Sequence, residues 1–133
     1  MARRRNSFLQ LLEHFRTIDA EIVVNDLLVF LYVCENEGLN IKELATLARL
    51  TEATASRRAR ALAGPDIAFP VAPSMGLVEI FQGEDARERL LYLTEKGRET
   101  RALVSRLIAA ATPLAPPPLG RVRDAVGARA ALD

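Results

Sequence analysis

The chain has 133 residues, half of them hydrophobic, which suits a single domain with its own apolar core. Its 18 basic and 17 acidic residues nearly cancel, so net charge alone indicates no polyanionic ligand. One cysteine excludes a disulfide framework within the chain, and no apolar run reaches the roughly 20 residues that span a bilayer. We expect a cytoplasmic globular protein without cofactor, metal or membrane partner.

The first part of the chain predicts three helices. The first is capped by Asn6 or Ser7, and its apolar residues follow the i, i+3, i+4, i+7 spacing: Phe8, Leu11, Leu12 and Phe15. The second, Val23–Glu37, is apolar nearly all round and therefore buried, with Gly38 as its stop. The third follows the cap Asn40 and carries one apolar face: Leu44, Leu47 and Ala48.

Thr51 is expected to cap a fourth helix, Glu52–Ala63, whose core-facing residues are Ala55, Ala59 and Leu62. At about 100° per residue, Ala53, Arg57 and Arg60 point the other way, with Thr54 and Ser56 beside them. Arg58 falls nearer the core and is expected to extend to solvent or to pair with an acid.

Charge is concentrated on this fourth helix. Residues 49–63 contain four arginines and one acid, a net +3, between stretches of net −5 (17–48) and −3 (64–99). Such a window is a candidate electrostatic footprint for nucleic acid. A solvated helix face is the plain alternative.

A β-hairpin and one more helix follow a proline-rich loop at 64–76. The strands Leu77–Gln82 and Glu88–Thr94 are rich in β-formers. Thr94 is expected to cap a helix that runs to about Ala111, with an apolar stripe: Leu103, Val104, Leu107, Ile108 and Ala111. For Arg121–Leu132 a short helix and disorder are both open.

The order helix, helix, turn, helix, hairpin, helix predicts a winged helix-turn-helix. Two helices linked by a tight turn need a small residue where they cross, which Ala45 supplies, and an apolar residue that locks the second helix onto the first, which Ala55 supplies. Leu50 fills the turn. In this architecture the second helix of the pair enters the major groove of DNA, which is about 12 Å wide. The hairpin is the wing.

Over Val24–Arg98 the sequence resembles the MarR family of winged helix-turn-helix regulators. The matching motifs are Ile41–Ala45, Leu50–Arg57, Gly76–Val78, Asp85-Ala86-Arg87 and Leu93-Thr94-Glu95-Lys96-Gly97. The last two, in register with each other, are the most specific.

The resemblance implies a mainly α fold with a small β-hairpin wing (α+β). Residues 1–22 would form an N-terminal arm and dimerisation helix, 23–97 the DNA-binding core, and 98–133 a C-terminal dimerisation helix and tail. It also implies a transcriptional regulator that binds double-stranded DNA as a homodimer on a pseudo-palindromic operator, with room for a small-molecule effector. Asp85 would orient Arg87 at the wing tip. The expected DNA-binding residues are Thr51, Ala53, Thr54, Ser56, Arg57, Arg60 and Arg87.

The sequence departs from the family pattern in four places. Arg49 stands in the turn where glycine is usual, and a left-handed backbone there would cost roughly 1 kcal/mol. The loop 64–75 is longer than usual, the first helix is short, and residues 82–88 carry a net −2. An acidic wing weakens attraction to phosphate. The alternative function is therefore a winged-helix module for protein–protein contact.

The remaining candidates have plainer interpretations. Arg3-Arg4-Arg5 indicates a solubilising terminus or a DNA-contacting arm, and His14 an ordinary helix position or a pH-sensitive group. Cys34 is expected to be an inert, buried thiol rather than a redox sensor. Glu35, Glu37 and Glu43 are expected to be solvated. Since no nucleophile–base pair, phosphate loop or metal-ligand spacing is present, we do not expect an enzyme.

Overall fold

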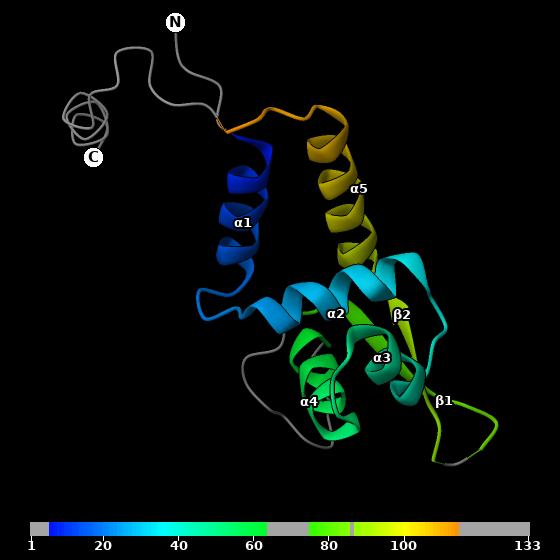
Figure 1. The fold of residues 1–133 in the computed structure, drawn as a ribbon. Coiled ribbons are helices and arrows are strands. Elements are labelled where there is room, and N and C mark those ends of the chain that lie inside the picture. The colour runs from blue at the N-terminus through cyan, green and yellow to red at the C-terminus, as the bar shows by residue number, and fades with distance from the viewer. Residues whose placement is uncertain (1–5, 64–74, 86, 115–133) are drawn as a thin grey trace, which may run out of the picture.

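The computed structural model describes residues 6–63, 75–85 and 87–114 (Figure 1). Within them the elements are α1 (Ser7–Ile18), α2 (Val24–Glu35), α3 (Ile41–Ala48), α4 (Glu52–Leu62), β1 (Val78–Gln82), β2 (Arg89–Leu93) and α5 (Glu95–Ala109). The predicted fold class, mainly α with a β-hairpin wing, is confirmed. Arg3–Arg5, Arg121–Leu132 and residues 64–74 of the predicted loop lie outside the described residues.

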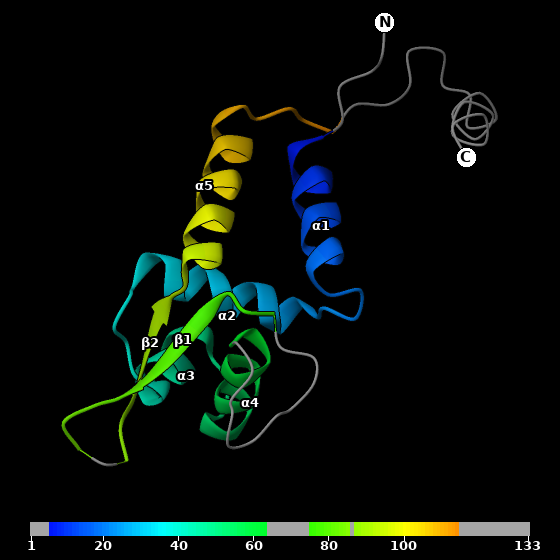
Figure 2. The ribbon, with the colours of Figure 1, turned by 180° about the vertical axis from the view of Figure 1, so that it is seen from behind.

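The elements form two tiers on either side of α2, which crosses the middle of the molecule (Figures 1 and 2). On one side α1 and α5 stand next to each other, and on the other side lie α3, α4 and the hairpin. The core joins both tiers. For example, the rings of Phe15 on α1 and Phe30 on α2 meet edge to face, 5.6 Å apart.

The predicted caps are confirmed, while several helix ends differ by one or two residues. Asn6 Oδ1 accepts a hydrogen bond from the Leu9 N–H at 3.1 Å, and Thr94 Oγ1 accepts one from the Gly97 N–H at 2.9 Å. The second helix ends at Glu35 rather than Glu37. The helix ends there because the residues that follow, from Gly38 on, form hydrogen bonds with the hairpin instead.

Residues 38–40 bond to β2 without forming a strand of their own, a contact that the sequence did not predict: Asn40 and Leu90 make an isolated antiparallel bridge beside the two-stranded hairpin. The Gly38 N–H donates to the Leu91 carbonyl at 2.7 Å, and the Leu91 N–H donates to the Leu39 carbonyl at 2.9 Å. Glu37 is exposed, as expected, yet its carboxylate also accepts the Leu93 N–H at 2.8 Å and lies 3.7 Å from Arg101 on α5. These contacts fix α2, β2 and α5 relative to one another.

The Leu93–Gly97 motif fastens the chain before β1 to the start of α5. The Thr94 hydroxyl donates to the Gly76 carbonyl at 2.6 Å, and Lys96 Nζ donates to the Met75 carbonyl at 2.9 Å. A Cβ on Gly97 would collide with the Leu77 carbonyl oxygen. The motif therefore has a structural task that explains its threonine, lysine and glycine.

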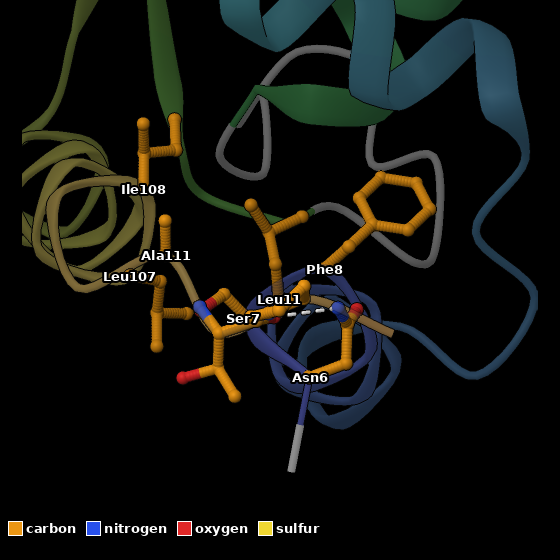
Figure 3. Close-up of a pocket in the computed structure, with 9 residues that line it drawn as sticks. Asn6, Ser7, Phe8, Leu11, Leu107, Ile108 and Ala111 are labelled. Carbon is orange, nitrogen blue, oxygen red and sulfur yellow. Dashed lines mark hydrogen bonds between the residues drawn. The ribbon is translucent and has the colours of Figure 1, made fainter. Parts of the chain in front are cut away.

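A hydrogen-bonded clasp joins the first residue of α1 to the chain after α5. The Ser7 N–H donates to the Thr112 carbonyl at 3.1 Å, and the Thr112 N–H donates to Ser7 Oγ at 2.8 Å. Asn6 Nδ2 also donates to the Thr112 carbonyl, at 2.6 Å (Figure 3). The clasp closes the end of the molecule that lies farthest from α4 (Figure 1).

Beside the clasp lies an apolar groove of about 520 Å³ between α1 and α5 (Figure 3). Leu11 in it is buried, whereas Phe8 is 65% and Ile108 64% exposed. The predicted apolar stripes on α1 and α5 are therefore only partly covered. Leu47 on α3 is also exposed, against the expectation that it faces the core, because Leu44 and Ala45 make that contact.

Candidate nucleic-acid interface

The helix-turn-helix is built from α3, a tight turn and α4. Reciprocal hydrogen bonds begin α3: Asn40 Oδ1 accepts the Glu43 N–H at 2.8 Å, and Glu43 Oε1 accepts the Asn40 N–H at 3.0 Å. Glu43, expected only to be solvated, thus has a capping role. Ala45 and Ala55 are buried, as the crossing of two helices requires, and Leu50 packs against the core from the turn.

The turn after α3 has the two backbone hydrogen bonds of a Schellman motif. The Leu50 N–H donates to the Ala45 carbonyl at 2.9 Å, and the Arg49 N–H donates to the Thr46 carbonyl at 3.4 Å. Arg49 has φ 57° and ψ 46°, in the left-handed region that the family's glycine would favour. The strained conformation considered from the sequence is therefore present.

The two faces of α4 divide as predicted. Ala55, Ala59 and Leu62 are fully buried, whereas Thr51, Ala53, Arg57 and Arg60 are exposed. Thr54 and Ser56 are half-buried between these faces. With two alanines against the core, α4 lies close to α2 and presents its polar side outward.

The N-terminal turn of α4 is organised by hydroxyl groups. Thr51 Oγ1 accepts the Thr54 N–H at 3.1 Å, which confirms the predicted cap. Arg57 Nη2 donates to Thr54 Oγ1 at 3.3 Å, so this guanidinium lies along the start of the helix. Among the described residues, Arg60 has no hydrogen bond or ion pair from its side chain, which leaves its charge available to a ligand.

Arg58 pairs with an acid, as the sequence predicted. Its Nη1 lies 3.2 Å from Oδ1 of Asp26 on α2, a residue only 2% exposed. The other oxygen of Asp26 accepts the Val23 N–H at 3.1 Å. Asp26 was not singled out in the sequence, because an acid within an apolar helix gives no sign of its distant partner.

The wing tip carries Arg87, whose side chain is exposed and, within the described residues, unpaired. Asp85 Oδ1 accepts the Arg87 backbone N–H at 3.0 Å. This bond fixes the main chain at the tip rather than the guanidinium. The Gly83 N–H donates to the Glu88 carbonyl at 2.9 Å and closes the hairpin below it.

The helix α4 and the wing lie at the same end of the molecule. Figures 1 and 2 both show α4 and the hairpin tip projecting away from α1 and α5. Arg57 and Arg60 on α4 and Arg87 on the hairpin tip are therefore at this end, with α3 close by. A helix beside a hairpin suits a ligand with a groove and a neighbouring ridge, such as duplex DNA.

Two further candidates from the sequence, Cys34 and His14, lie on α2 and α1. Cys34, expected to be buried, is half-buried. This partial burial raises the pKa of its thiol from 9.0 to about 11, with Arg101 opposing that rise. His14 is half-buried, with its ring 6.2 Å from that of Phe15. In residues 6–63, 75–85 and 87–114, no three His, Cys, Asp or Glu side chains gather as a metal ion would need, and no helix is long and apolar enough to cross a bilayer.

No protein-family model and no curated protein match this sequence. Solved structures do match the fold, and their proteins are MarR-family transcriptional regulators. A DNA complex of Staphylococcus aureus MepR aligns with a TM-score of 0.60 and 19% identity, over 78% of this chain and 74% of that chain. A MarR regulator from Methanosarcina mazei Go1 aligns with a TM-score of 0.55 and 16% identity, over 78% and 73%.

The transcriptional repressor CouR, bound to a 23-mer DNA duplex, aligns with a TM-score of 0.54 and 27% identity, over 79% of this chain and 69% of that chain. Other neighbours are longer: this chain covers 66% of disulfide-form AbfR and 60% of a MarR protein from Peptoclostridium difficile. The resemblance found in the sequence is thus confirmed as a shared winged-helix fold.

Proposed function

We propose that the protein is a transcriptional regulator that binds double-stranded DNA sequence-specifically, with α4 in a major groove. The observation that carries this proposal is the face of α4 itself. Arg57 and Arg60 project from a helix whose opposite side is anchored by buried alanines and by the Arg58–Asp26 pair. A rigid helix with an exposed small and basic face suits insertion between two phosphate backbones.

The proposed contacts on this helix are Thr51, Ala53, Thr54, Ser56, Arg57 and Arg60. The guanidinium groups are suited to guanine edges or phosphates, and the hydroxyls to either. Arg87 would enter the adjacent minor groove, with Asp85 holding the backbone of the wing tip. MepR and CouR, which share the fold, were solved in complex with DNA, and this supports DNA as the ligand.

We further propose that the protein acts as a homodimer on a pseudo-palindromic operator. The groove between α1 and α5 leaves Phe8 65% and Ile108 64% exposed, and two large apolar side chains along one groove suit contact with another protein surface. A second copy seated there would bury it and set two α4 helices on one duplex. We also propose that this regulator acts in the cytoplasm and that a small-molecule effector controls it.

The second candidate function is protein–protein contact through the winged module, without tight DNA binding. It is favoured by the wing, where Glu79, Glu84 and Asp85 are exposed, and by Phe81, which is 49% exposed. Acidic groups repel phosphate, whereas an exposed aromatic ring suits a protein partner. Neither function makes the protein an enzyme.

Selection of bound fragments from a random duplex pool, followed by a gel shift at two salt concentrations, separates the candidates. A DNA-binding regulator enriches a pseudo-palindrome and loses affinity steeply as salt rises, because phosphate contacts release counterions. No enriched sequence, together with weak binding at low salt, would reject the regulator and leave the protein-contact module.

A further inference from the structure

The turn between α3 and α4 contains an arginine where the backbone favours glycine. Arg49 is the non-glycine residue with positive φ in the described part of the chain. Both hydrogen bonds of the turn come from backbone N–H groups, so glycine would form them equally well and without a crowded Cβ. The backbone therefore gives no reason for an arginine at this position.

The Arg49 side chain has no partner among the described residues that would explain it either. It is exposed, and within residues 6–63, 75–85 and 87–114 its guanidinium makes no hydrogen bond or ion pair. Its positive charge lies near the negative, carboxyl end of the α3 dipole, but this attraction is weak and is screened by salt. Strained residues that internal contacts do not require often serve a ligand.

Other residues on α3 extend the same exposed side. Lys42, Thr46 and Arg49 are spaced i, i+4, i+7, and all three are exposed. The carboxylate of the nearby Glu43 accepts the Asn40 N–H and is therefore held at the start of α3, away from Arg49. One side of α3 thus presents two cations and a hydroxyl, and it leads directly into Thr51, the cap of α4.

We propose that Arg49, together with Lys42, binds phosphates of the DNA backbone beside the groove that receives α4. This inference rests on the proposed function and adds a sequence-independent anchor to it. In helix-turn-helix docking the first helix of the pair crosses the backbone, where phosphate contacts set register and orientation. The arginine would then be kept for binding, at the expense of turn stability.

The test compares Arg49→Gly, Arg49→Asn and Arg49→Lys for thermal stability and for the salt dependence of binding. Glycine and asparagine both tolerate a left-handed backbone, so these two variants should raise Tm, glycine by about 3–6 °C. They should also lower the magnitude of the slope of log affinity against log salt by about 1 for each protomer bound. The loss should be equal on operator and random duplexes, and Arg49→Lys should restore the slope.

Arg106→Ala on α5 is the matched control, because this exposed arginine lies in the other tier and its loss should leave the slope unchanged. A more stable Arg49→Gly protein with the wild-type slope would overturn the proposal. So would an Arg49→Gly protein of lower Tm, or an affinity loss confined to one base pair of the operator. If the wild type itself shows no salt-dependent binding, the proposed function fails as well, whereas wild-type binding with an unchanged Arg49→Gly slope rejects this inference alone.

Discussion

The guanidinium of Arg58 on α4 lies 3.2 Å from the carboxylate of Asp26 on α2, which is buried. This pair is the charged contact between the two helices that the described residues contain. Ala55 and Ala59 give α4 a smooth inner face, so side-chain packing alone constrains its rotation weakly. The pair supplies a directional restraint that alanines lack.

Arg58→Met should lower the free energy of unfolding by about 2 kcal/mol, because it leaves the buried Asp26 charged and without a cation. The value is below that of a fully buried pair, since the Arg58 side chain is 31% exposed. Urea denaturation measures the change. Arg57→Met, on the exposed side of the same helix, is the control and should stay within about 0.5 kcal/mol of wild type. Equal effects of the two substitutions would contradict the role of the pair.

Arg57→Ala should weaken binding to the selected operator by about 1–3 kcal/mol, the usual worth of one good base or phosphate contact. Its guanidinium already lies along the start of α4, 3.3 Å from Thr54 Oγ1. Titration by gel shift measures the loss, and urea denaturation verifies that the variant folds. A folded variant with unchanged operator affinity would remove Arg57 from the interface.

Arg87→Ala should weaken binding most on operators with A·T-rich flanks, where the minor groove is narrow and its potential most negative. The measurement compares wild type and variant on two duplexes that share a core and differ in flanking A·T content. If Arg87 served only as an ion-pair partner for the acids of the wing, Arg87→Ala would reduce the binding free energy by at most about 1 kcal/mol. Equal losses on both duplexes, or none, would exclude the minor-groove role.

The protein should sediment at micromolar concentration with about twice the 14.6 kDa of one chain. Phe8→Glu or Ile108→Glu should shift it toward the monomer, because each places a charge in the apolar groove. Leu47→Glu is the control: Leu47 is 44% exposed on α3, in the other tier, and the variant should stay dimeric. A wild-type monomer under these conditions would refute dimerisation.

The Cys34 thiol should react slowly with thiol reagents at pH 8. Its pKa of about 11, against an ordinary 9.0, reduces the thiolate fraction roughly a hundredfold. Because the folded value is the higher one, the thiol stabilises the fold fully below pH 9.0, and this contribution is lost as pH rises through about 11. The measurement is the rate at which the thiol reacts with a chromogenic disulfide in native and in urea-unfolded protein, and the Cys34→Ser variant gives the background rate. Equal rates in both states would contradict the shift.

Periodicity and caps were sufficient to predict most of the fold. The asymmetry of the fourth helix, with Ala55 and Ala59 inward and Arg57 and Arg60 outward, follows from 3.6-residue spacing and is confirmed. Caps such as Thr94 mark helix starts because they act within a few residues of the chain. Such local signals can be recognised from the sequence alone.

Contacts between distant segments were harder to predict. The contact of residues 38–40 with β2 involves too few residues for an alternating pattern, and it forms because the Leu91 backbone lies beside them. Leu47 looks equivalent to Leu44 in the sequence, yet only the path of neighbouring helices decides which is covered. The partner of Asp26 lies on α4, beyond the reach of any local pattern.

The clasp between Ser7 and Thr112 brings the first and last described segments of the chain together. The polypeptide enters and leaves this body at one point, at the end opposite α4 (Figure 1). The described chain therefore begins and ends away from the face proposed for DNA. The clasp and the face of α4 proposed for DNA thus lie at opposite ends of the molecule (Figure 1).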